Sequence, residues 1–244
     1  MNIVITNDDG ANAPGLRALF HAVRQLGRVH VVAPRTQRSA CSHTLTLRTP
    51  ITCNIIDLDG IGTVHAVDGT PADCVRLANA VLVEDPIDLV VAGNNRGANS
   101  GVDTYYSGTV AAAREAAQLG LQAVAVSQAV RGDTEIDWTA AARITRHVVA
   151  SLAAERLEGP GFWNVNLPLP IPPDAEQRIR RVPVAQDPVP VGFDRVERDG
   201  DGAVAFNLRS TPSYWSRDVA GATDFGVVRD GGVAVSAIGL RAAF

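Results

Sequence analysis

The sequence predicts an α/β fold in three layers, α/β/α, with helices covering both faces of a mostly parallel sheet. Short apolar runs typical of strands alternate with amphipathic segments typical of helices, and polar, glycine-containing loops follow the strands. This alternation is typical of parallel sheets, whose strands are connected through helices. With 244 residues, 46% of them hydrophobic, the chain can bury one large core, with or without an appendage.

The alternation begins with the first residues. The apolar run Ile3–Thr6 predicts a strand, and apolar residues then repeat at helical spacing from Leu16 to Leu26, where Gly27 ends the helix. The run Val29–Ala33 predicts a second strand. Between residues 44 and 67 the alternation is weaker, so we expect only short extended pieces there.

The middle of the chain continues this pattern. Thr70 and Asp73 form a capping-box pattern around Pro71 and predict the start of a helix. An alanine-rich helix is expected to open at residues 107–109, and Asp137 is expected to cap a long helix. The remaining expected elements are the strands Asp88–Ala92, Ala123–Ser127 and Phe162–Asn166 and the helix Trp138–Leu157.

The composition changes after residue 167. Prolines are frequent from Pro168 to Pro183, and residues 178–208 predict extended strands around a turn at residues 199–202. A helix start at Thr223-Asp224 and a strand at Val233–Ile238 follow. We therefore divide the chain into a core, residues 1–167, and a hairpin segment, residues 168–244, whose last helix and strand return to the core.

Charge and composition exclude several classes of function. The net charge of −4 argues against binding to nucleic acid or a membrane surface, and no stretch reaches the length of a transmembrane helix. The three cysteines form no CxxC motif, which argues against structural zinc. Their small number and the absence of an export signal predict a cytoplasmic protein. All 22 basic residues are arginine, which excludes a Schiff-base lysine and a Walker-type phosphate loop.

Two adjacent carboxylates at the end of the first strand form the first candidate site. Asp8 and Asp9 lie in the loop Asn7–Gly10, directly after the apolar run. In open α/β sheets, ligands bind outside the carboxyl ends of the strands. A pair of carboxylates there suits a hard cation, which prefers oxygen ligands. The alternative is a solvated turn, because Asp and Gly are also common in turns.

Loops after the neighbouring strands offer further oxygen ligands at the same edge. The loop from Arg35 carries the Ser39 hydroxyl, and the loop 93–99 carries several asparagine carbonyls. The turn Ser107-Gly108-Thr109 starts a helix, where free backbone N–H groups can bind an anion. The alternatives are Asx-turns for the asparagines and simple N-capping by Ser107.

An ordered set of motifs runs along nearly the whole chain. Its stretches are residues 5–10 with 13–15, 33–46, 69–75, 95–99, 107–111, 164–168 and 223–224. In this order they resemble the SurE (survival protein E) family of metal-dependent 5'/3'-nucleotidases. The chain departs from the usual family pattern at Ala40, Ala92 and Asn94, and again at residues 237–240.

The resemblance implies a Rossmann-like core with one divalent cation per subunit, Mg²⁺ or Mn²⁺. The implied metal ligands are Asp8, Asp9, Ser39 and Asn95, with Asp8 and Asp9 also catalytic. The residues implied to lie against the substrate phosphate are Asn99, Ser107, Gly108 and Thr109.

The resemblance also implies a hydrolase of phosphoric monoesters. It would convert nucleoside monophosphates to nucleoside and phosphate with a water molecule that the cation activates. An aspartyl-phosphate intermediate is less favoured, because no second carboxylate follows at the i+2 position. Two other functions stay open: a phosphatase for polyphosphate or another phosphorylated metabolite, and a non-catalytic regulatory protein that binds nucleotide or metal. A dinucleotide-binding dehydrogenase is excluded, because no GxGxxG motif follows the first strand.

The carboxyl-terminal segment predicts self-association. A projecting hairpin with few apolar residues is stable only if it packs on something, and a second copy of the chain is a suitable partner. The resemblance points the same way, to a homodimer or homotetramer. The expected contact residues are Phe193, Phe206, Tyr214 and Trp215. The alternative is that these aromatic side chains cover the sheet of their own subunit.

Overall fold

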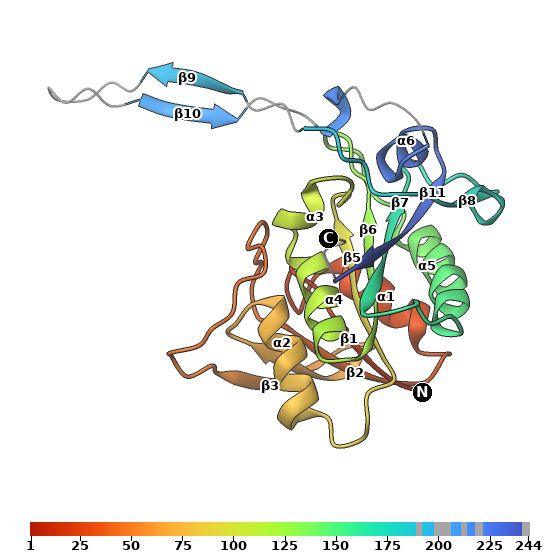
Figure 1. Cartoon of the computed structure of the whole chain (residues 1–244). Helices are drawn as coiled ribbons and strands as arrows, with labels where there is room; N and C mark the ends of the chain where they lie inside the picture. Colours follow the sequence, from red (N-terminus) through yellow and green to blue (C-terminus); the bar gives the residue numbers. More distant parts are fainter. Residues whose placement is uncertain (189–191, 198–205, 211–213, 218–221, 241–244) are drawn as a thin grey trace, which may run out of the picture.

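The computed structural model describes residues 1–188, 192–197, 206–210, 214–217 and 222–240. It confirms the α/β fold, built on a nine-stranded sheet (Figure 1). The strands of this sheet are β1 (Asn2–Thr6), β2 (Arg28–Pro34), β3 (Cys53–Leu58), β4 (Gly62–Val67), β5 (Leu89–Arg96), β6 (Gln122–Gln128), β7 (Gly161–Leu167), β8 (Ile179–Arg181) and β11 (Val233–Gly239). The helices are α1 (Pro14–Val23), α2 (Pro71–Leu77), α3 (Asp103–Tyr106), α4 (Gly108–Gln118), α5 (Trp138–Ala153) and α6 (Asp224–Arg229).

The sheet is mostly parallel, as the sequence predicts. Its strand order is β3-β4-β2-β1-β5-β6-β7-β11-β8, and the run from β4 to β7 is parallel throughout. Outside this run β3 pairs antiparallel with β4 and β11 pairs antiparallel with β7, while the edge strand β8 pairs parallel with β11. The loops after β1, β2, β5 and β6 therefore leave from the same edge of the sheet.

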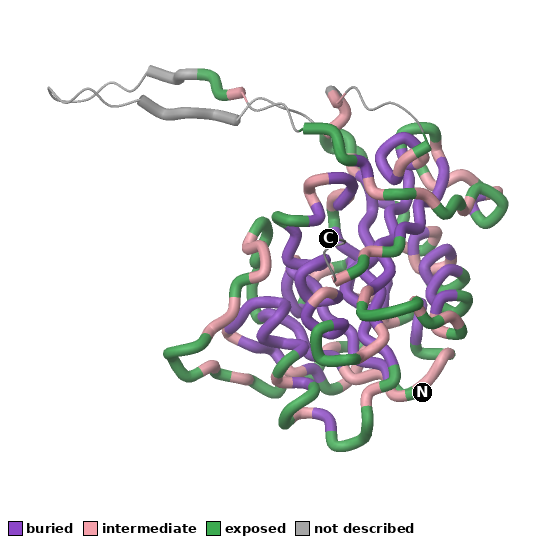
Figure 2. The backbone as a smooth tube through the Cα atoms, in the orientation of Figure 1, coloured by how far each residue is buried: buried purple, intermediate pink, exposed green. Residues whose placement is uncertain are grey.

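Helices cover both faces of the sheet, and alternate residues of a strand face different layers. Ile3 and Ile5 of β1 lie in the core under α1 and α5, whereas Val4 lies in the core under α2 and α4. All three side chains are fully buried. Figure 2 shows this burial along the central strands, which explains why the strands appear in the sequence as continuous apolar runs.

Several elements end at residues other than those expected. Helix α5 stops at Ala153, where the Gln122 side-chain amide donates hydrogen bonds to the carbonyls of Leu152 and Glu155 (both 2.8 Å). Strand β5 runs on to Arg96, and the weakly alternating region 44–67 contains the antiparallel pair β3 and β4. Helix α3 has only four residues and was not expected.

The carboxyl-terminal hairpin consists of β9 (Phe193–Glu197) and β10 (Phe206–Ser210), which pair antiparallel. Figure 1 shows this pair projecting away from the body of the molecule. The turn expected at residues 199–202 lies outside the described residues. Tyr214 and Trp215 bind within their own chain: the Tyr214 hydroxyl donates to Ser100 Oγ (3.0 Å), and Trp215 Nε1 donates to the Val130 carbonyl (2.6 Å). Their part in an assembly stays a prediction.

None of the helices in the described ranges is both long enough and apolar enough to cross a membrane.

The capping box of α2 gives a test of local stability. The Thr70 hydroxyl accepts a hydrogen bond from the Asp73 N–H (3.1 Å) and donates one to the Thr44 carbonyl (2.7 Å). We expect Thr70→Ala to lower the free energy of unfolding by about 1 kcal/mol, as loss of an N-cap hydroxyl does. Thr70→Ser keeps the hydroxyl and is the matched control in a urea unfolding experiment. Equal stability of the two variants would contradict the role of this cap.

Candidate metal and phosphate site

The loop after β1 holds its two carboxylates in a fixed turn. The Asn7 side-chain amide donates to the Gly10 carbonyl (3.0 Å), and the Gly10 N–H donates to Asn7 Oδ1 (3.2 Å). Gly10 has a φ of 104°, which favours glycine, so the chain can turn sharply at this point. Asp8 and Asp9 are thereby directed at different neighbours.

Asp8 points at the amino terminus of α4. Its Oδ1 accepts a hydrogen bond from the Thr109 hydroxyl (2.5 Å), and its Oδ2 accepts one from the Thr109 N–H (3.3 Å). The helix amino terminus carries partial positive charge, which stabilises a carboxylate there. A Cβ atom at Gly108 would lie 3.0 Å from Asp8 Oδ2 and 2.9 Å from the Cys41 sulfur, so this close approach requires glycine.

Asp9 points at β5, where its Oδ2 accepts a hydrogen bond from the Arg96 N–H (3.0 Å). Neither Asp8 nor Asp9 forms an ion pair with any described residue. Burial raises the pKa of Asp8 to about 6, and the charge of Asp9 adds to this shift. Burial likewise raises the pKa of Asp9, against the opposing hydrogen bond from Arg96. Two carboxylates are therefore crowded into a partly dehydrated site, where the charge of Arg96 offsets only part of the rise in the pKa of Asp9.

Ser39 lies on the exposed loop after β2. Its Oγ accepts a hydrogen bond from the Gln37 side-chain amide (2.8 Å). The Arg38 N–H donates to the Asp8 carbonyl (2.7 Å), so the backbone beside Ser39 is joined directly to the carboxylate loop.

Asn94 and Asn95, which the sequence could not tell apart as ligands, make different contacts. Asn94 is fully buried, and its Oδ1 accepts a hydrogen bond from the Thr145 hydroxyl of α5 (3.1 Å). The Asn95 side-chain amide donates to the Gly97 carbonyl (2.8 Å), which leaves its own carbonyl oxygen available. Asn95 is therefore the better candidate for a metal ligand.

The donor set fits a hard divalent cation. Asp8 and Asp9 offer carboxylates, and Ser39 and Asn95 offer neutral oxygens, as Mg²⁺-type sites do. Within the described residues, no three His, Cys, Asp or Glu side chains gather at one point. A cation here would therefore depend on the neutral oxygens and on water in addition to the two carboxylates.

The side chains expected to bind phosphate are already engaged within the protein. Ser107 Oγ accepts a hydrogen bond from the Val110 N–H (3.1 Å) and so caps α4, and the Thr109 hydroxyl is bound to Asp8. Asn99 uses its side-chain amide to bind Ser127 Oγ (2.7 Å) and its N–H to bind Asn166 Oδ1 (2.7 Å). The Thr109 N–H is bound to Asp8 and the Val110 N–H to Ser107, so an anion at this turn would meet mainly the Gly108 N–H at the start of α4.

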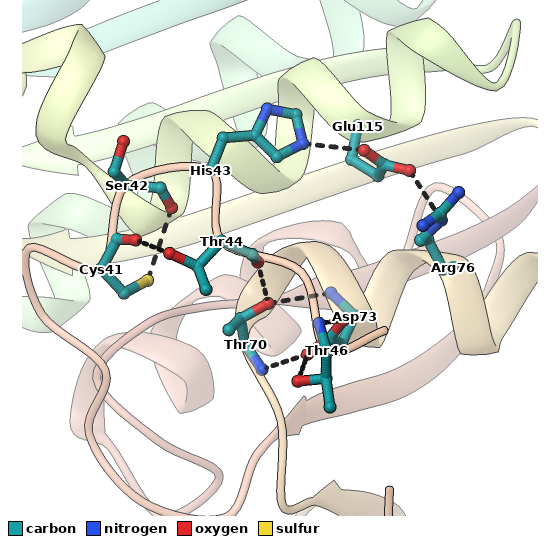
Figure 3. A network of polar contacts seen from close by, with 9 residues as sticks. All are labelled: Cys41, Ser42, His43, Thr44, Thr46, Thr70, Asp73, Arg76 and Glu115. Atoms are coloured by element: carbon teal, nitrogen blue, oxygen red, sulfur yellow. Dashed lines mark hydrogen bonds and ion pairs between the residues drawn. The ribbon is translucent and has the colours of Figure 1, made fainter. Parts of the chain in front are cut away.

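A polar network, which the sequence analysis missed, anchors the Ser39 loop (Figure 3). Thr46 donates to Asp73 through its N–H (2.9 Å) and its hydroxyl (2.7 Å). His43 Nε2 and Glu115 Oε2 are 2.7 Å apart, and Arg76 Nε lies 3.0 Å from Glu115 Oε1. The capping pattern of Thr70 and Asp73 was the one part of this network that could be predicted from the sequence. The partners of Glu115 could not be found without the fold.

A cleft of about 630 Å³ opens beside Asp9. Its lining includes Gln37 and Arg96, and also Ile136 and Trp138 at and just before the start of α5. A smaller hollow of about 240 Å³ lies at the opposite edge of the sheet, near Gln122 and Gly161, and contains none of the candidate site residues. The larger cleft is the one that adjoins the carboxylates.

Comparison with known proteins places the chain in a family. Residues 3–187 match the family described as Survival protein SurE. A protein named 5'-nucleotidase SurE from Rhodopirellula baltica is 47% identical over 169 residues, which cover 69% of this chain and 66%, just under two thirds, of that protein. A protein of the same name from Geobacter sulfurreducens is 39% identical over 249 residues, which cover 98% of this chain and 88% of that protein.

A solved structure agrees with these matches in sequence. The crystal structure of the SurE protein from Aquifex aeolicus has a TM-score of 0.83 and 31% sequence identity, and the match covers 100% of this chain and 95% of that one. Similarity in both sequence and fold, extending over the strand ends that carry Asp8, Asp9 and Asn95, shows that this chain belongs to the SurE family.

Proposed function

We propose that this chain is a metal-dependent phosphatase that hydrolyses nucleoside monophosphates, 5'- or 3'-nucleotides, to nucleoside and phosphate. The observation that carries the proposal is the pair of adjacent carboxylates, the buried Asp8 at the amino terminus of α4 and the half-buried Asp9, neither of which forms an ion pair with a described residue. Relatives named 5'-nucleotidase SurE support a nucleotide as the substrate.

One divalent ion per subunit, Mg²⁺ or Mn²⁺, is proposed at the four oxygen ligands Asp8, Asp9, Ser39 and Asn95. When bound, such an ion supplies Lewis-acid polarisation of a phosphoryl oxygen and lowers the pKa of water. Thr109 fixes the orientation of Asp8, and the Arg96 N–H fixes that of Asp9.

The protein groups around this centre have separate roles in the reaction. The Gly108 N–H, at the start of α4, stabilises the negative charge that grows on the phosphoryl oxygens in the transition state, since the next two N–H groups are bound to Asp8 and Ser107. Both oxygens of Asp8 accept hydrogen bonds from Thr109, whereas only Oδ2 of Asp9 accepts one, from Arg96. Asp9 Oδ1 is therefore the oxygen that we assign to accept the proton of the attacking water.

Assembly and location follow as further proposals. A homodimer or homotetramer is supported by the hairpin β9–β10, which projects from the body (Figure 1), and by the exposure of Phe193 on it. A cytoplasmic location is supported by three free thiols, Cys41, Cys53 and Cys74.

Removal of metal and of one carboxylate tests the catalytic proposal. Phosphate release from a panel of nucleoside monophosphates, short polyphosphate and sugar phosphates should require Mg²⁺ or Mn²⁺ and stop in EDTA. Asp9→Asn should lower kcat by roughly a hundredfold or more, because it removes a group that acts in the transition state. Asp57→Asn, an exposed carboxylate on β3, is the matched control. Full activity in EDTA, or an unimpaired Asp9→Asn variant, would refute the mechanism.

The contact between Asp8 and α4 gives a second test. Thr109→Val removes the hydroxyl bound to Asp8 and should lower kcat and metal affinity together, while Thr109→Ser should retain most of both. Gly108→Ala places a methyl group against Asp8 and Cys41 and should be the more damaging change. Isothermal titration with Mn²⁺ and steady-state kinetics measure both effects. Normal turnover in Gly108→Ala would show that this turn only caps the helix.

The proposed assembly can be measured directly. Light scattering at low micromolar concentration should give a mass of at least two 25.7 kDa chains. Phe193→Ser should shift this equilibrium towards the monomer, whereas Ile55→Ser, which alters an exposed apolar residue on β3, should not. A fully active 25.7 kDa monomer would contradict the proposal.

A further inference from the structure

The cleft beside Asp9 has a volume of about 630 Å³. This volume lies within the range of about 300–1,000 Å³ that is usual for small-molecule sites. Asp9 belongs to its lining, so the cleft is continuous with the proposed metal site. A substrate whose phosphate lies at Asp9 would extend into this space.

Part of the cleft lining is apolar. It includes Ile136, which is buried, and Trp138, which is partly exposed. Pro14, at the start of α1, adds a further apolar surface. A partly exposed indole ring is a surface on which a planar base can stack, and such stacking tolerates any base.

The segment between β6 and α5 provides a polar side. Asp133, Thr134 and Glu135 line the cleft from this segment, and all three are exposed. Carboxylates accept hydrogen bonds from sugar hydroxyls and from exocyclic amino groups, but they repel a phosphate. The part of the cleft that these three residues line therefore suits the uncharged part of a nucleotide.

The cleft lining also includes a cationic residue next to the proposed metal site. Arg96 donates its N–H to Asp9, and its guanidinium forms no ion pair with the described part of the chain. Arginine is well suited to phosphate oxygens, and this chain contains no lysine for that purpose. The lining thus combines Asp9 and Arg96 with acidic and aromatic residues from the start of α5 and the segment before it.

We propose that this cleft is the nucleoside subsite, in which the base stacks on Trp138 and the sugar hydroxyls face Asp133 and Glu135. The proposal rests on the proposed function, since it assigns the leaving group of that reaction. A second cleft of about 440 Å³, lined by Tyr105 and Arg114, contains none of the four proposed metal ligands and is the competing location.

Binding of a nucleoside without phosphate tests the subsite separately from catalysis. Adenosine is titrated into the full-length protein in EDTA, with heat as the readout. Trp138→Ala should weaken adenosine binding by about tenfold or more, while Trp138→Phe should keep most of it. Tyr105→Ala, which alters the competing cleft, should leave the affinity unchanged.

Trp138 also packs near Gly15, so its replacement could disturb the fold. A second variant therefore tests the cleft without altering Trp138. Thr134→Trp fills the cleft from an exposed position and should block adenosine without disturbing the core. For the active protein, Trp138→Ala should lower kcat/KM for adenosine monophosphate much more than for methyl phosphate, which has no base or sugar.

The outcomes separate the two proposals. If adenosine binds through Trp138 but no nucleotide releases phosphate, the proposed function fails and the subsite remains. No adenosine binding by the unaltered protein, loss of binding in Tyr105→Ala instead of Trp138→Ala, unchanged binding in Thr134→Trp, or equal losses for both substrates would overturn the subsite.

Discussion

The hydrogen bonds between Asp8 and Thr109 join two elements that lie about a hundred residues apart, β1 and α4. A carboxylate this deeply buried is unfavourable unless its charge is balanced, and here the balance comes from a hydroxyl, a backbone N–H and the amino terminus of a helix. These groups offset only part of the cost, because the pKa of Asp8 still lies near 6. The remaining imbalance is what a divalent cation would correct, so the metal affinity that we propose would depend on the contact between Asp8 and the start of α4.

The Asn7–Gly10 turn separates the roles of two otherwise equivalent carboxylates. Asp8 is held by α4 through both of its oxygens, whereas Asp9 is held through one oxygen by β5. Asp9 also borders the cleft that reaches Trp138, and Asp8 does not line it. Asp8 can therefore serve as a fixed ligand, while Asp9 lies where metal, water and substrate would meet.

Much of the fold could be predicted, because the central strands are buried on both faces and appear as apolar runs such as Ile3–Thr6. Helix α3 could not be predicted, since its four residues are too few to show helical periodicity. The different contacts of Asn94 and Asn95 could not be predicted either. The Asn94 side chain is bound by Thr145, which lies 51 residues further along the chain. Sequence patterns identified the candidate residues, but their orientation depends on tertiary contacts.

The loop that carries Ser39 shows how the site tolerates a departure from the family pattern. Ala40 stands where the pattern usually has glycine, and its φ of 54° lies in the left-handed region that favours glycine. Such a conformation costs on the order of 1 kcal/mol and persists only where neighbouring contacts hold it. Here the contacts lie on both sides: the Arg38 N–H is bound to the Asp8 carbonyl, and Thr46 is bound to Asp73. Because the loop is fixed at both ends, the backbone that carries Ser39 can keep its place next to the Asp8 loop although Ala40 is strained.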